Sequence, residues 1–253
     1  MEHEGYRVTA EHEESHWWFL ARRRLFLAQV RKAAGELGYP GRRLSLLDYG
    51  CGTGYNLRYL AEFGDVSGAD VSDLSLGEFR KPGPYPIYDL RAGAGSRLPR
   101  FDVVTLLDVL EHMDDDAEGL RKVADLLRPE GQIVITVPAY RWLWSGEDEL
   151  SRHKRRYTRG GLLDCCARAG LEVLHASYFN ALILPAMAAV IWKNRIFSPG
   201  RYRESSVQPT SGWLNRLLYR IASFEAGLVG TGRVSPLAGA SIVCRVRAAR
   251  GSA

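Results

Sequence analysis

Three glycines that follow a short apolar run are the residues of this sequence best suited to hold a bulky ligand. They are spaced two apart after the run 44–49, and they are Gly50, Gly52 and Gly54. A continuous apolar run is typical of a strand buried in a parallel sheet. Glycine accepts a positive φ and has no Cβ, so such a turn lets a ligand lie against the main chain. A second predicted strand, 66–70, ends in Asp70, where an acidic residue can accept hydrogen bonds from a ribose diol. Together these features predict a cofactor that contains adenosine.

The spacing of the glycines distinguishes between two kinds of adenosine cofactor. A dinucleotide fingerprint needs G-x-G-x-x-G, but residue 55 is Tyr. The spacing G-x-G-x-G, with Asp48 two residues upstream, instead resembles motif I of the class I methyltransferases that use S-adenosylmethionine (SAM). Segment 101–112 resembles the family's F-D-x-V-x-x-x-x-V-x-E-H motif. Segment 127–138 resembles its helix, Pro-Gly-type turn and fifth strand, with Glu130 where glycine is commoner. The resemblance covers about residues 44–180.

This resemblance implies SAM as the cofactor, S-adenosylhomocysteine (SAH) as its product and a Rossmann-like fold. The expected fold class is α/β, with a doubly wound, seven-stranded, mostly parallel sheet whose last strand is antiparallel. The cofactor-binding residues that it implies are Asp48, Gly50, Cys51, Gly52, Gly54, Asp70, Val71, Asp89, Leu90, Leu107, Asp108 and His112. One methyltransferase domain is expected over 1–253, with a helical lid at 1–36, a SAM-binding core at 37–178, a helical cap or insertion at 179–239 and a final strand at 240–248.

The N-terminal segment 11–31 has the spacing of an amphipathic helix. The sequence HWWF at 16–19, followed by three arginines, resembles the N-terminal segment of a group of bacterial class I methyltransferases. In such relatives this helix closes over SAM. Trp18 and one of Arg22 or Arg23 are therefore expected at the cofactor, the Arg on its carboxylate. Packing of the aromatic residues on the sheet is an equally good interpretation.

The stretch 138–157, after the predicted fifth strand, is rich in aromatic, acidic and basic side chains. Aromatic walls could exclude water while Arg and Lys bind an anionic group such as phosphate, diphosphate or carboxylate. A solvated basic face at the start of the predicted helix 158–169 is the alternative. The stretch also resembles the L-W-S-x-x-D-x-x-x-x-H-x-R-R-Y segment of the same bacterial group. The candidate acceptor-binding residues are Tyr140, Trp142, Trp144, Arg152, Arg155, Arg156, Tyr157 and Asn180.

Two histidines are candidates for catalysis. A base is needed only if the acceptor carries a proton, as a hydroxyl or an amine does. His153 is the first candidate and His112 the second. His153 would act protonated if it binds a phosphate. His112 could instead hydrogen-bond the substrate or cap the turn before the acidic residues 114–116.

The apolar run 181–192 lies within the expected insertion. Its twelve residues are too few for a membrane-spanning helix, which takes about twenty. Three roles stay open for it: the wall of an acceptor pocket or a subunit contact, core packing, and contact with a membrane interface. Segment 213–224 is a second amphipathic helix, and a mixed apolar and basic cap would suit an amphiphilic acceptor.

The composition limits the partners of the chain. The net charge of +5 and the pI of about 9.1 suit an anionic partner, but no nucleic-acid-binding motif accompanies them. The four cysteines include no C-x-x-C pair and no zinc-type spacing appears, so no metal site is expected. Reduced thiols and the lack of an apolar signal-peptide core indicate a cytoplasmic protein. Peripheral contact with a membrane and a homo-oligomer are left open.

The sequence therefore predicts a SAM-dependent methyltransferase for a small or lipid-like anionic acceptor, such as an isoprenoid diphosphate or another phosphate-bearing intermediate. A methyltransferase for the hydroxyl or amine of a neutral natural product is the alternative within this class. A non-catalytic docking protein of the same fold is disfavoured by the intact glycine turn with Asp48 and Asp70. A nicotinamide oxidoreductase is disfavoured by Tyr55.

Overall fold

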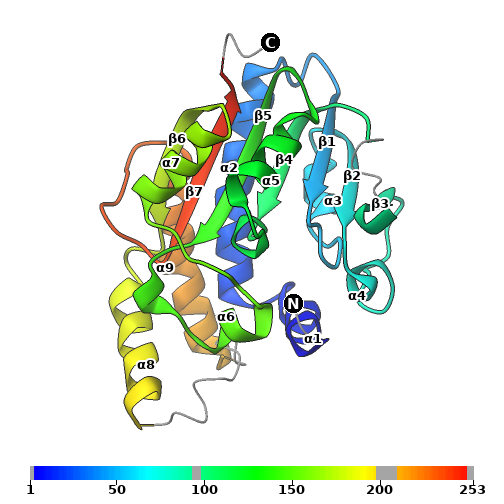
Figure 1. Ribbon diagram of the computed structural model, residues 1–253. Helices are drawn as coiled ribbons and strands as arrows, with labels where there is room; N and C mark the ends of the chain where they lie inside the picture. The colour runs from blue at the N-terminus through cyan, green and yellow to red at the C-terminus, as the bar shows by residue number, and fades with distance from the viewer. Residues whose placement is uncertain (1–2, 93–97, 198–209, 250–253) are drawn as a thin grey trace.

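A twisted sheet of seven strands runs through the molecule in the order β3-β2-β1-β4-β5-β7-β6 (Figure 1). The computed structural model describes residues 3–92, 98–197 and 210–249. The strands are β1 (Leu44–Tyr49), β2 (Gly64–Asp70), β3 (Ile87–Asp89), β4 (Phe101–Leu107), β5 (Leu127–Pro138), β6 (Leu171–Phe179) and β7 (Ser241–Ala248). β7 pairs antiparallel with both β5 and β6, and the pairs among β1 to β5 are parallel. The predicted fold class is confirmed.

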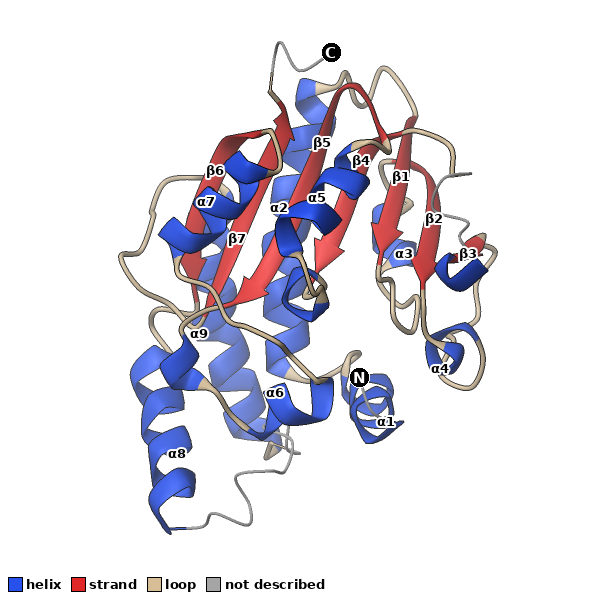
Figure 2. Cartoon of the chain, in the orientation of Figure 1, coloured by secondary structure: helices blue, strands red, loops and turns tan. Residues whose placement is uncertain are grey.

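The strands are apolar on both sides because helices cover both faces of the sheet (Figure 2). One face carries α2 (Trp17–Glu36), α3 (Leu57–Leu60) and α9 (Gly212–Gly230), and the other carries α5 (Asp116–Ala124) and α7 (Arg159–Arg168). The alternation within β1 shows this division: Leu46 packs with α2 and α3, whereas Leu47 packs with α5 and α7. Both side chains are fully buried, so the sheet is the centre of the core.

The segment 127–138 differs from the predicted helix, turn and strand, because all of it belongs to β5. The strand accommodates an irregular register opposite Phe101 and Val103. Glu130 has a φ of 63°, and a Cβ on Gly131 would lie 2.9 Å from the carbonyl oxygen of Arg128. The Pro-Gly-type turn is therefore a local irregularity within one strand. After the glycine turn the chain forms only the short helix α3 (Leu57–Leu60) before β2.

Two helices replace the single N-terminal helix predicted over 11–31. They are α1 (His3–His12) and α2, separated by residues 13–16. The break is stabilised at its end, because the His16 side chain accepts a hydrogen bond from the Trp18 backbone N–H and caps α2. α1 turns away to lie beside α6 (Gly146–Ser151) below the carboxyl ends of the parallel strands (Figure 1).

The expected insertion holds α8 (Leu184–Phe197) and α9, which behave differently. α9 packs against α2 and the end of the sheet through Ala222, Ala226 and Val229, so it belongs to the core. α8 extends away from the sheet (Figure 1) and has no buried residue, which makes core packing of the run 181–192 wrong for most of its length. Ile183, just before α8, is the buried exception. Within the described ranges, no helix is long and apolar enough to cross a membrane.

The carboxyl edge of the sheet is completed by short elements. They are α4 (Asp73–Leu76), η1 (Leu90–Ala92), η3 (Leu110–His112) and η4 (Arg141–Leu143). Because each parallel strand ends at this edge, the residues that follow β1, β2, β4 and β5 meet there with α1 and α6.

Candidate active site

The glycine turn after β1 has the backbone conformation that the sequence predicts. Gly50, Gly52 and Gly54 have φ values of 78°, 54° and 77°, in the left-handed region that favours glycine. A Cβ on Gly50 would also lie 2.5 Å from Cγ2 of Val109, too close for any side chain. The turn therefore needs glycine at this position both for its dihedral angle and for the close approach of the segment after β4.

Two buried carboxyl groups fix this turn. Asp70 accepts hydrogen bonds from the backbone N–H of Gly52 (2.8 Å) and of Ser72 (2.9 Å). Asp48 is buried in β1 and accepts a hydrogen bond from the Thr105 hydroxyl (2.6 Å). Burial raises the pKa of Asp48 to about 6. Asp48 therefore joins β1 to β4, while Asp70 lies at the turn itself.

A cavity of about 330 Å³ opens between this turn, α1, α2 and the end of β4. Most of the residues predicted to bind the cofactor line it: Arg22, Arg23, Asp48, Gly50, Cys51, Gly52, Asp70, Val71, Leu107, Asp108 and His112. Its volume and its mixed lining of backbone, carboxylates and aromatic side chains are those of a small-molecule site.

Four predicted cofactor residues lie outside the lining of this cavity. Asp89 forms an ion pair with Arg91, and Leu90 packs against the main core cluster. Gly54 shapes the turn. The Trp18 ring lies 5.3 Å from the Arg22 guanidinium carbon, so it supports a lining residue and does not itself reach the cavity.

α1 contributes lining residues that sequence reasoning missed, chiefly Tyr6, Thr9 and, just after the helix, Glu13. Glu13 is buried and accepts a hydrogen bond from the Thr53 hydroxyl at 2.8 Å. Burial raises the pKa of Glu13 to about 7. No motif identifies these residues, because α1 reaches the site only through tertiary packing. The other missed residues are Phe19, Phe26, Thr53, Asn56, Val109 and Thr136.

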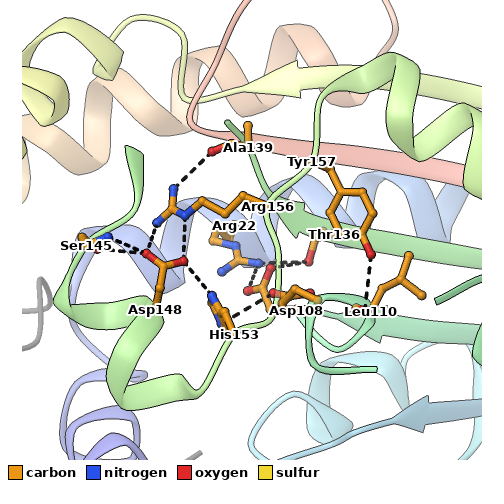
Figure 3. A network of polar contacts seen from close by, with 11 residues as sticks. Arg22, Asp108, Leu110, Thr136, Ala139, Ser145, Asp148, His153, Arg156 and Tyr157 are labelled. Atoms are coloured by element: carbon orange, nitrogen blue, oxygen red, sulfur yellow. Dashed lines mark hydrogen bonds and ion pairs between the residues drawn. The ribbon is translucent and has the colours of Figure 1, made fainter. Parts of the chain in front are cut away.

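The two candidate arginines of α2 have different partners. Arg22 donates to the Thr136 hydroxyl at 2.9 Å and forms an ion pair with Asp108 (Figure 3). Arg23 is buried and donates to the Glu13 backbone carbonyl at 2.8 Å and to the Asn56 side chain at 3.2 Å. Arg22 therefore has its guanidinium at the end of β4, whereas Arg23 holds the α1–α2 connection in place.

A buried network follows β5 and centres on Asp148 (Figure 3). Asp148 accepts two hydrogen bonds from Arg156, both 2.7 Å, and one from His153 Nδ1 at 2.8 Å. Burial would raise the pKa of Asp148, but these hydrogen bonds from His153 and Arg156 outweigh it and lower the pKa to about 2. The carboxylate is therefore ionised at neutral pH and fixes the orientation of the His153 ring.

His153 and His112 lie side by side. Their ring centroids are 4.8 Å apart, and His112 lines the cavity. Burial, followed by the nearby His153, lowers the pKa of His112 to about 4, so His112 is neutral at physiological pH. Both catalytic candidates are thus brought to one place, with His112 nearer the cavity.

The basic cluster predicted to bind an anion is largely paired with acids. Arg155 forms an ion pair with Asp116 (2.9 Å), whose carboxylate also accepts a hydrogen bond from the Tyr157 hydroxyl (3.0 Å). Arg156 is held by Asp148. Arg155, Arg156 and Tyr157 do not line the cavity, and their role in acceptor binding stays a prediction.

The remaining acceptor candidates lie around the same edge but outside the cavity lining. Tyr140 stacks between Trp142 (centroids 5.8 Å apart) and Tyr178 (5.2 Å apart). The Trp144 indole donates to Glu149 at 2.7 Å, and Arg152 caps α6 in a left-handed conformation. Asn180 is fully buried at the end of β6, and both polar atoms of its side chain have no hydrogen-bond partner among the described residues.

The fold and the site define a nucleotide-binding α/β protein of the methyltransferase class. The defining features are the glycine turn after β1, the acid at the end of β2 and the cavity at the carboxyl edge of the sheet. Residues 19–176 match the family described as a methyltransferase domain. The match takes in more than half of the chain, so this chain belongs to that family, whose class uses SAM as its cofactor.

Individual relatives agree with this assignment. A probable S-adenosylmethionine-dependent methyltransferase of Mycolicibacterium smegmatis is 27% identical over 176 residues, which cover 67% of this chain and 65% of that protein. A ubiquinone biosynthesis O-methyltransferase of Alkalilimnicola ehrlichii is 35% identical over 107 residues, 39% of this chain and 42% of that protein. The chain thus spans less than two thirds of the length of these relatives.

Solved structures show the same fold. The plantazolicin methyltransferase BamL, in complex with a triazolic desmethylPZN analog and SAH, has a TM-score of 0.58 and 16% identity; 95% of this chain and 88% of that one are covered. The putative methyltransferase in complex with the Trm112 activator of Haloferax volcanii has a TM-score of 0.55 and 17% identity. The comparison covers 99% of this chain and 96% of that one.

Proposed function

We propose that the chain binds SAM in the 330 Å³ cavity and transfers its methyl group to a small or lipid-like acceptor. The observation that carries this proposal is the continuity of the cavity. It extends from the glycine turn and Asp70 to Asp108 and His112, so a nucleoside and a reacting group can share one cavity. SAM supplies an electrophilic methyl group, and the protein's task is to position donor and acceptor and to exclude water.

The residues of the cavity suit SAM. The Asp70 carboxylate lies where it can accept hydrogen bonds from the ribose hydroxyls, and the glycine turn leaves room against the main chain. Arg22 can bind the carboxylate of the amino-acid part, because a guanidinium forms bidentate pairs with carboxylates. Its present partner is the carboxylate of Asp108, so the site already holds a carboxylate beside Arg22.

His112 is the side chain we propose to meet the acceptor. It lines the cavity, and its imidazole is neutral at physiological pH, so it can accept a proton from a hydroxyl or an amine. His153 would support it from behind, oriented by Asp148. A carboxylate acceptor would need no base.

The observations on the acceptor favour two different chemical classes, an anionic one and a neutral one. The Arg159 guanidinium carbon lies 5.9 Å from the ring centroid of Tyr178, next to the aromatic stack of Tyr140 and Trp142, and could hold an anionic group. The pairing of Arg155 and Arg156 with acids favours a neutral phenolic or hydroxyl acceptor instead. The relative named as a ubiquinone biosynthesis O-methyltransferase supports oxygen on a lipid-like molecule as the methylated atom.

Peripheral contact with a membrane would suit a lipid-like acceptor. α8 exposes Val190, Trp192 and Phe197, and its C-terminal half carries Lys193. Exposed apolar side chains beside a basic one are a feature of surfaces that contact a protein or a membrane.

Calorimetric titration with SAH, followed by methyl transfer from labelled SAM to a panel of acceptors, tests the proposal. The panel contains isoprenoid diphosphates, lipid-linked sugar phosphates and neutral long-chain phenols. Transfer to an anionic member that weakens on Arg159→Ala supports an anionic acceptor, and transfer to phenols that Arg159→Ala leaves unchanged supports a neutral one. A folded sample that does not bind SAH contradicts the proposed function.

A further inference from the structure

A cluster of three potential metal ligands lies beside the cavity. Glu111 and His112 belong to η3, and His153 follows α6. One ligand atom from each of the three residues lies within 4.8 Å of the others. The two segments are far apart in the sequence, so these ligands show none of the short spacings that indicate a metal site. For that reason the sequence led to the expectation of no metal site.

Glu111 is the unusual member of this cluster. Its side chain is fully buried, and neither carboxylate oxygen has a hydrogen-bond partner among the described residues. Burying a carboxyl group without hydrogen bonds destabilises the fold, unless a group from outside the protein chain satisfies its oxygens. Nε2 of His153 lies 3.8 Å from Oε1 of Glu111.

The orientation of His153 makes this contact informative. Its Nδ1 donates to Asp148, because both oxygens of this carboxyl group already accept hydrogen bonds from Arg156. In the neutral ring the lone pair is then on Nε2 and faces Glu111. Two acceptors that face each other across 3.8 Å need a cation between them, which is either a proton or a metal ion.

We infer that Glu111, His112 and His153 bind a divalent transition-metal ion of the Zn²⁺ class. Two imidazoles and one carboxylate are the ligand set of catalytic zinc sites and suit first-row transition metals, whereas Mg²⁺ prefers oxygen ligands and water. This inference goes beyond the proposed function and does not depend on the identity of the acceptor, but it replaces the base role proposed for His112, because a nitrogen lone pair bound to a metal ion cannot also accept a proton.

The surroundings fit the ligands. Asp148 holds the second nitrogen of His153, as outer carboxylates do for metal-bound histidines, and Arg156 holds Asp148 in turn. Ligand atoms at about 2.1 Å from a tetrahedral zinc are about 3.4 Å apart, so the side chains must draw together slightly on binding. The open coordination position would face the cavity that His112 lines.

Cobalt binding tests this inference directly. The full chain is stripped with a chelator and titrated with Co²⁺, whose visible absorption reports its ligands, and Zn²⁺ is then added as competitor. We expect one Co²⁺ per chain, displaced by Zn²⁺. Glu111→Gln and His153→Ala should each weaken binding at least tenfold. His3→Gln is the matched control, because His3 is exposed and pairs with Glu78, and binding should be unchanged.

Thermal unfolding separates a metal from a proton at this site. Excess Zn²⁺ should raise the Tm of the unmodified chain and of His3→Gln, but not that of Glu111→Gln. If Zn²⁺ leaves the Tm unchanged, or if Co²⁺ binds Glu111→Gln as tightly as the unmodified chain, the inference is wrong and Glu111 shares a proton with His153. SAH titration of the same samples reports the proposed function separately.

Discussion

Arg22 of α2 and Asp108, the residue after β4, form an ion pair at the wall of the cavity. Their side chains are 15% and 27% exposed, so the pair is largely shielded from water. The Thr136 hydroxyl accepts a further hydrogen bond from Arg22 at 2.9 Å. Through this pair the N-terminal helix reaches the strand ends, which ties the proposed lid to the cofactor site.

Replacing Arg22 should therefore weaken cofactor binding. We expect Arg22→Ala to lower the affinity for SAH at least tenfold, because a charge-assisted hydrogen bond contributes about 1.5–3 kcal/mol. Arg22→Lys should recover part of the loss, since it keeps the charge but not the planar fork. Calorimetric titration measures both. Arg31→Ala is the control, because Arg31 lies on the same helix but pairs with Glu62 at the surface; an equal loss there would argue against a specific role for Arg22.

Asp70 should matter for the affinity of the chain for the cofactor. Asp70→Asn keeps the shape of the side chain but removes its charge, so SAH binding should fall about tenfold or more. Asp65→Asn is the control in the same strand, because its side chain is 80% exposed. Titration of both variants with SAH checks the prediction, and unchanged affinity in Asp70→Asn would remove the ribose assignment.

The glycine turn gives a prediction about stability. Gly50→Ala would place a Cβ 2.5 Å from Val109 at a φ of 78°, so we expect the free energy of unfolding to fall by about 1–3 kcal/mol. Gly35→Ala, in α2, meets nothing within 4 Å and should raise it by about 0.5–1 kcal/mol. Urea unfolding of the two variants measures both changes. Similar effects in the two would contradict the packing argument.

Arg156 distinguishes a structural role from an acceptor-binding one. It forms a buried pair with Asp148, so Arg156→Ala should take the guanidinium away from a buried carboxylate that keeps only its hydrogen bonds from His153 and Ser145, and lower the free energy of unfolding by about 3–5 kcal/mol. Arg121→Ala removes an exposed pair with Glu118 and should cost less than about 1 kcal/mol. Should Arg156→Ala instead unfold normally and only raise KM for an acceptor, the sequence-based prediction of acceptor binding would be supported.

Glu13 should make stability depend on pH. Its pKa is raised from 4.5 to about 7 in the folded chain, so the folded state binds more protons than the unfolded state between these values. The free energy of unfolding must then fall as pH rises from about 4.5 to 7, by up to about 3 kcal/mol. Glu13→Gln has no such proton to lose. Urea unfolding from pH 5 to pH 8 measures the free energy of unfolding of this variant and of the unmodified chain. As the pH rises, the variant should become increasingly more stable than the unmodified chain. A constant difference would mean that the Glu13 carboxyl group titrates normally.

The sequence by itself determined the parts of this protein that are local. The apolar strands, the glycine turn and the acid at Asp70 follow from residue types and short spacings, because a strand, a turn and its ligand-facing glycines are contiguous in the chain. Most of the cofactor candidates line the cavity, because they belong to these contiguous segments. The long-range contacts of α1 were absent from this prediction, because no periodicity indicates that Glu13 will meet Thr53.

Only the tertiary structure determines which basic side chains near β5 are paired with acidic ones. The sequence shows five bases between 152 and 159. Three of them pair with acids: Lys154 with Asp114, Arg155 with Asp116, and Arg156 with Asp148, and Asp114 and Asp116 come from another segment. Charge pairing depends on distances of a few ångströms between groups that are remote along the chain. The same reason explains why Glu111, His112 and His153 form a cluster that spacing alone could not predict.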